Sequence, residues 1–172
     1  MKMKKYFLIV LVALFSVGAT AQKFAYVDTD YILSKIPEFN DAQAQLDDMV
    51  GKWQKEVESK ISEIDKMYKE YQANRVIYPE EMRQKKENEI IEKETKLKEF
   101  QNSKFGEEGE LFKKRKELIE PIQERVYNAI QDVARDQKLA IIFDKAGTTT
   151  VIYSDIKYNV SDDVLENLGY AY

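Results

Sequence analysis

The chain has no cysteine and no histidine among its 172 residues. Without cysteine it can form no disulfide and no thiolate, so its stability depends on packing or on oligomerisation. Without histidine it lacks the residue that proteins use most often as a general base and metal ligand. These absences argue against an enzyme, although paired carboxylates could in principle still carry chemistry. We therefore predict no catalytic residues, no cofactor and no metal site.

Long apolar runs are also missing after residue 20. The N-terminus has three lysines in its first five residues, an apolar run over residues 6–17 and the small residues Ala19-Thr20-Ala21. This order predicts a cleaved signal peptide over residues 1–21, and hence a periplasmic protein. An uncleaved membrane anchor is the alternative, but a run of about 12 residues is shorter than the ~20 that span a bilayer.

Basic residues are fewer than acidic residues in this chain. The chain has 27 basic and 31 acidic residues, and removing the three lysines of the signal peptide leaves 24 basic residues and a net charge of −7. Because nucleic acid is bound mainly through positive charge on the protein, we predict no nucleic-acid partner.

Helix breakers are rare between residues 41 and 120, where we predict a long antiparallel coiled-coil hairpin. The apolar residues of its first half recur at intervals of three and four and mark one seam: Leu46, Val50, Trp53, Val57, Ile61, Ile64, Tyr68 and Tyr71. Two successive intervals of four make this pattern slip against a heptad, which would place Lys60 in the seam. We therefore expect a locally unwound coiled coil. The tip lies at residues 74–79, and the second helix should begin near Pro79.

Two glycines, Gly106 and Gly109, interrupt the second helical run, each at a cost of about 1 kcal/mol relative to alanine. We interpret them as a hinge in the arm. Close helix approach or a local kink is an equally good alternative. The basic run over residues 113–116 is interpreted as a solvated face with ion pairs, and contact with an anionic membrane surface is the alternative.

The segments that flank the arm, residues 22–40 and 121–172, predict a small β-rich oligomerisation body. Residues 23–27 read as a strand. Asp28 to Asp30 offer caps for a short helix over residues 31–36, which Pro37 ends.

After the arm, Pro121 should kink the helix or restart it. Residues 139–143 and 149–153 predict a β-hairpin with a turn at 145–148. A last helix is capped by Ser161 and ended by Gly169.

Three short strands leave open edges and an uncovered apolar face in a single chain. Closing several such sheets about a rotation axis removes both, so we predict a cyclic homo-oligomer. The large strand residues would form its interface: Phe24, Tyr26, Ile141, Phe143, Val151 and Tyr153.

The order of these parts resembles the Skp, or OmpH-like, family of periplasmic chaperones. Ala25-Tyr26-Val27-Asp28, the run from Leu139 to Asp144, and Val160-Ser161-Asp162-Asp163-Val164-Leu165 carry the resemblance. It implies an α+β, mostly α fold, in which a homotrimer projects three tentacle-like helical arms from a β-strand body. It also implies that unfolded outer-membrane proteins are held, without ATP, until they insert into the membrane. The best-known members are basic, whereas this chain without its signal peptide is acidic.

Apolar residues near the tip of the arm are the candidates for client contact: Met67, Val76, Ile77 and Tyr78. An apolar loop tip in water is hard to explain as packing. Tyr68 and Tyr71 continue the seam and are assigned to packing within the hairpin. The alternative function is a structural coiled-coil spacer or adaptor of the cell envelope, which predicts a fixed partner and a stiff arm.

Overall fold

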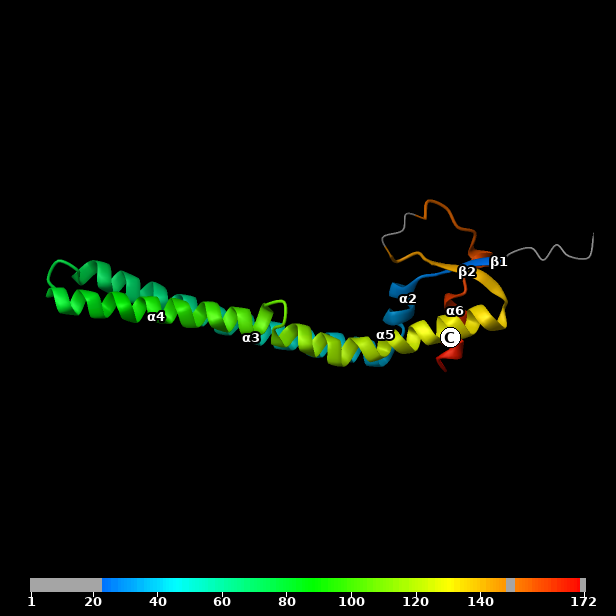
Figure 1. Ribbon diagram of the computed structural model, residues 1–172, viewed down its shortest axis with the longest axis horizontal. Helices are drawn as coiled ribbons and strands as arrows, with labels where there is room; N and C mark the ends of the chain where they lie inside the picture. The colour runs from blue at the N-terminus through cyan, green and yellow to red at the C-terminus, as the bar shows by residue number, and fades with distance from the viewer. Residues whose placement is uncertain (1–22, 148–150, 171–172) are drawn as a thin grey trace, which may run out of the picture. The chain divides into compact units, whose positions relative to one another are not determined.

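The computed structural model describes residues 23–147 and 151–170 (Figure 1). The predicted signal peptide, residues 1–21, lies outside this part of the chain, as do residues 148–150. The chain divides into two compact units. The hairpin unit is Tyr31–Asn128, and the strand unit joins the residues up to Asp30 with those from Ala129 onward. That residues 41–120 act as an arm and their flanks as an oligomerising body stays a prediction.

The hairpin unit contains α3 (Pro37–Asn74), α4 (Glu80–Phe105) and the start of α5 (Glu110–Asp136). Helices α3 and α4 are antiparallel (Figure 1). Tyr71 near the end of α3 contacts Glu87 near the start of α4, whereas Trp53, earlier in α3, contacts Phe105 at the end of α4. Pro37 opens α3 and does not merely end the preceding helix, so α3 starts earlier than predicted. Proline suits this place because the first turn of a helix has no internal use for its N–H.

The seam between α3 and α4 follows the predicted pattern only in part. Ile64 and Tyr71 are buried with Ile90, and Met67, Tyr78 and Leu97 pack against this cluster. Ile61 and Tyr68, however, are each 43% exposed. Two intervals of four residues carry Ile61 about 80° around the helix from Trp53, out of the contact. Lys60 faces α4 at this level, with its Nζ 5.1 Å from the Phe100 ring centroid.

A break separates α4 from α5 at residues 106–109. After it, α5 runs without interruption through Pro121, so the predicted restart of the helix at this proline is wrong. Ile119, Ile122, Val126, Ala129 and Val133 are the buried apolar residues of α5.

The strand unit holds a two-stranded parallel sheet of β1 (Lys23–Val27) and β2 (Leu139–Asp144). Phe24 pairs with Ile141, and Val27 with Asp144. The predicted β-hairpin is wrong in its described part, because residues 151–155 form no strand. Ile152 and Tyr153 are 94% and 84% exposed. Without a partner strand, β-propensity alone does not make a β-branched run form a strand.

Three short helices complete the described chain: α2 (Thr29–Ser34), the 3₁₀ turn η2 (Ile156–Tyr158) and α6 (Ser161–Asn167). Asp144, at the end of β2, accepts hydrogen bonds from Thr29 N and Thr29 Oγ1 at 3.2 and 2.7 Å and so caps α2. Ser161 is buried and does not cap α6 as predicted. Its Oγ accepts from Asp28 N and donates to Asn159 Oδ1, at 2.9 and 2.7 Å.

The predicted class, a mostly helical α+β fold with a long helical hairpin and a small sheet, is confirmed.

Candidate functional site

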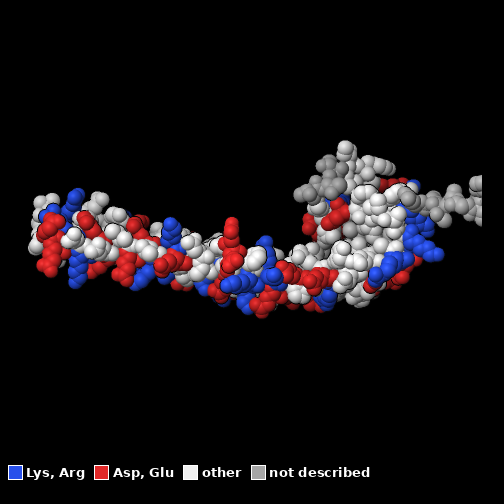
Figure 2. All heavy atoms as spheres, in the orientation of Figure 1, with Lys and Arg blue, Asp and Glu red and all other residues white. Residues whose placement is uncertain are grey.

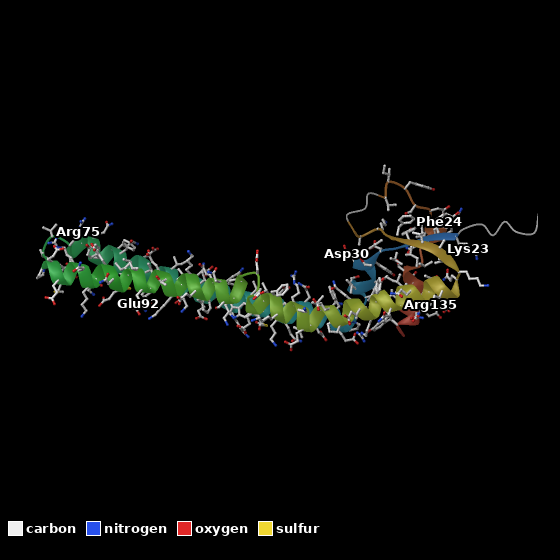
Figure 3. All side chains as sticks on the ribbon, viewed as in Figure 1. Lys23, Phe24, Asp30, Arg75, Glu92 and Arg135 are labelled. Carbon is white, nitrogen blue, oxygen red and sulfur yellow. The ribbon has the colours of Figure 1, made fainter. Side chains whose placement is uncertain are left out.

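The tip of the hairpin presents apolar side chains to solvent. Asn74 O ends α3 and accepts from Ile77 N and Tyr78 N, at 3.0 and 3.1 Å, which makes a tight connection to α4. In this turn Val76 is 95% and Ile77 is 75% exposed. Arg75, labelled in Figure 3, lies beside them at the same end of the hairpin. Two adjacent aliphatic side chains this exposed are available for an apolar partner.

The other two predicted client residues lie differently. Met67 and Tyr78 pack against the buried cluster of Ile64, Tyr71 and Ile90. Truncating either would therefore disturb the hairpin itself, and only Val76 and Ile77 combine exposure with the absence of a packing role in the described structure.

Charged groups join α3 to α4. The Tyr71 hydroxyl donates a short hydrogen bond to Glu87, and that bond is the main reason why the pKa of Tyr71 is raised. Lys93 Nζ donates to Glu63 Oε1 at 2.7 Å, which lowers the pKa of Glu63. Figure 2 shows acidic and basic side chains interspersed along the visible face of the hairpin. These pairs add little to the stability of the hairpin, because exposed ion pairs contribute about 0–1 kcal/mol each.

The strand unit contains an apolar groove of about 860 Å³. Five of the six predicted interface residues line it: Phe24, Tyr26, Phe143, Val151 and Tyr153. Phe24 and Lys23 at the start of β1 are labelled in Figure 3. Ile141 is exposed but does not line the groove. The sequence reasoning missed Tyr158, which also lines it, since a residue in a 3₁₀ turn carries no strand periodicity.

The two predicted hinge glycines lie at the break between α4 and α5. A Cβ on Gly106 would come within 2.5 Å of Asn102 O, and a Cβ on Gly109 within 2.9 Å of Gly106 N. The close approach is therefore one of the chain with itself, where α4 ends, and the break accommodates no side chain at either position. This close approach explains why the break needs glycine, and bending of the arm at the break stays a prediction.

The described residues include no group of three or more acidic side chains placed to hold a metal ion. Within the same residues, no helix is long and apolar enough to cross a membrane.

Comparison with known proteins places the chain in a family. Residues 23–168 match the family described as outer membrane protein (OmpH-like). The chain belongs to the OmpH-like family. The resemblance found in the sequence is thereby confirmed.

Two relatives show how far the likeness extends. A protein of Aquifex aeolicus (strain VF5) without an assigned function is 26% identical over 166 residues, or 96% of each chain. A crystal structure from Caulobacter crescentus CB15, described as a candidate OmpH-like outer membrane chaperone, matches with a TM-score of 0.65. It is 12% identical and covers 88% of this chain and 86% of that one. At this identity the match shows a shared fold.

Proposed function

We propose that this protein is a chaperone of the periplasm that holds unfolded outer-membrane proteins soluble, without ATP, until they insert into the membrane. Membership of the OmpH-like family and the shared fold with a candidate outer membrane chaperone support this role. The N-terminal signature over residues 1–21 supports export. The role needs no enzyme activity and no cofactor.

The observation that carries the proposal is the pair of exposed aliphatic side chains at the tip, Val76 and Ile77. Burying a side chain of this size is worth about 1.5–3 kcal/mol, so each makes a weak contact that a mobile client can exchange. Release needs no nucleotide, because closing a β-barrel in the membrane satisfies every backbone hydrogen bond and outcompetes such contacts.

Cyclic assembly, with a homotrimer as the predicted state, completes the proposal. The apolar groove of the strand unit supports assembly through this unit, as does the outer edge of β2, which pairs with no further strand among the described residues. Several hairpins around one axis would surround a client with many weak contacts at once.

The test is the aggregation of a urea-unfolded outer-membrane barrel protein after dilution, followed by light scattering without nucleotide. We expect wild type to suppress scattering and V76S/I77S to lose about half or more of that effect, since each serine removes an apolar contact. The matched control V76L/I77L keeps apolar side chains at both positions and should act like wild type.

Equal suppression by V76S/I77S and wild type would remove the tip from the client surface. A wild-type protein that suppresses nothing, but purifies with one stoichiometric envelope partner, would favour the spacer or adaptor function instead.

A further inference from the structure

The hairpin of α3 and α4 has two long sides of different chemistry. On one of them, here called the paired side, Lys93 binds Glu63 at 2.7 Å and Lys86 lies 3.9 Å from Glu70. Along α4 on this side, Lys96 pairs with Glu92, labelled in Figure 3, at 2.5 Å. Carboxylates and ammonium groups thus satisfy one another along the paired side.

The opposite side, here called the open side, carries exposed apolar groups. Each residue of an α-helix turns ~100°, so Ile61 and Tyr68 lie across the buried line of Ile64 and Tyr71 from Glu63 and Glu70. The same count places Ile91 of α4 on the open side, across the buried Ile90 from Lys86 and Lys93. Ile61 and Tyr68 are each 43% exposed and Ile91 is 56% exposed.

Half-buried Val57 extends this stripe toward the break at residues 106–109. The stripe therefore runs along the hairpin, and it is apolar like the exposed aliphatic pair at the tip. Of the five exposed large apolar side chains of α3 and α4, Ile61, Tyr68, Ile91 and Phe105 lie on the open side by this count and Met82 lies on the paired side. Apolar exposure concentrated on one side in this way marks an interaction surface more than scattered surface residues do.

Carboxylates beside the stripe lack the ion pairs seen on the paired side. By the same helical count Glu58 and Asp65 of α3 and Glu94 of α4 lie on the open side. None of the three makes an ion pair with another described residue. By the same count Lys69 and Lys98 share this side, so three carboxylates against two lysines leave an excess of negative charge. An apolar stripe flanked by unpaired carboxylates complements a ligand that is apolar and positively charged.

We propose that the open side binds extended segments of unfolded polypeptide in which apolar side chains alternate with lysine or arginine. Such a segment places its apolar groups on Ile61, Tyr68 and Ile91. Its lysine and arginine side chains reach Glu58, Asp65 and Glu94, and the aliphatic stems of those lysines and arginines lie along the stripe. This inference rests on the proposed chaperone function and assigns its client segments a chemistry. It gives the acidic balance of the chain a role, whereas a basic cavity would select acidic segments.

The experiment measures binding of two labelled 20-residue peptides to the full-length protein without its signal peptide, by fluorescence anisotropy. Both peptides alternate valine or tyrosine with polar residues, and they differ only in carrying four lysines or four glutamates. We expect the lysine peptide to bind about tenfold more tightly at low salt, and the difference to shrink as added salt screens the charges.

Two charge-matched triple variants locate the site. E58Q/D65N/E94Q removes three carboxylates from the open side and should weaken binding of the lysine peptide by about tenfold. E63Q/E70Q/E92Q removes three from the paired side and should change it by less than about twofold. All six carboxylates are on the surface of the hairpin, so helicity by circular dichroism should stay the same in both. The further variant I61S/Y68S should weaken both peptides.

Equal affinity for the two peptides, or equal losses in the two triple variants, would overturn the assignment of the open side. If wild type also suppresses aggregation in that case, the chaperone function stands and only its client chemistry is wrong. If wild type neither binds a peptide nor suppresses aggregation, the proposed function fails as well.

Discussion

Lys138 holds a left-handed backbone conformation, with φ at 56°, between the end of α5 and the start of β2. A residue with a Cβ pays about 1–2 kcal/mol for this conformation, because the Cβ approaches the neighbouring carbonyl oxygen. Gly169, which ends α6 with φ at 87°, meets the same demand without that cost. Tyr170 N donates to Leu165 O and Gly169 N to Glu166 O across this turn, both at 2.9 Å.

Replacing Lys138 with glycine should therefore raise the free energy of unfolding by about 1 kcal/mol, after the greater freedom of glycine in the unfolded chain is counted. Urea denaturation at one fixed protein concentration measures this. K138A is the control, because alanine keeps the Cβ and should not gain. A gain that is the same in both variants would mean that the lysine side chain, and not the backbone, is the source of strain.

Single residues also show where sequence reasoning stops. The end of α6 at Gly169 followed from its residue type, because a local turn decides it. Ser161 looked like a helix cap, yet its hydroxyl binds Asp28 N from a segment 133 residues away in sequence. A serine competes for local and distant partners with similar energies, and only the tertiary structure settles which one it takes.

At the scale of elements, the break between α4 and α5 lies level with a third glycine. Trp53 of α3 packs edge-on against Phe105, the last residue of α4, with ring centroids 5.8 Å apart. Gly51 is therefore close to the level of the break, and nothing lies within 4 Å of where its Cβ would be, so packing does not require glycine there. Glycine therefore lowers helix stability at the same level on both sides of the hairpin, in α3 and at the junction of α4 with α5. This supports the hinge proposed for Gly106 and Gly109.

Hydrogen exchange should accordingly be faster at residues 103–110 than in the helical stretches on either side, because a hinge opens its backbone hydrogen bonds locally. Mass spectrometry of peptides from the native protein measures this, and peptides containing the buried Ile90 serve as the protected reference. Uniform protection across residues 95–120 would show a rigid kink in place of a hinge.

The elements themselves were predictable where periodicity is strong. The hairpin, its tip and the start of α4 near Pro79 follow from intervals of three and four and from proline chemistry. The outward drift of Ile61 was visible as a slip, but its exposure depended on what α4 offers at that level, and Lys60 packs there on Phe100. The partner of β2 was misjudged because strand propensity says nothing about which strand pairs with it.

At the scale of the whole molecule, assembly through the strand unit predicts that a charge in its apolar groove separates the chains. F143D places a charge in the apolar groove at a side chain that is partly exposed, so the chain can still fold alone. Because burying an unpaired carboxylate is costly, the molar mass by light scattering should fall from that of a trimer to that of one chain. F112D is the control, since Phe112 is an exposed phenylalanine of the hairpin unit. A trimer that survives F143D would place the interface elsewhere.

The parallel pairing of β1 with β2 has a consequence for the order in which the chain folds. The two strands are separated by about 110 residues, so the sheet closes a loop that contains most of the described chain. The helices between them form through local contacts and need not wait for either end. Folding of α3 and α4 first would replace most of that flexible loop with rigid structure and lower the entropy lost on closure. In the proposed export of the chain, strand β1 would emerge early and would have no partner strand until the last fifth of the chain follows. During that interval it is itself an unfolded apolar segment in the compartment where this protein is proposed to protect others.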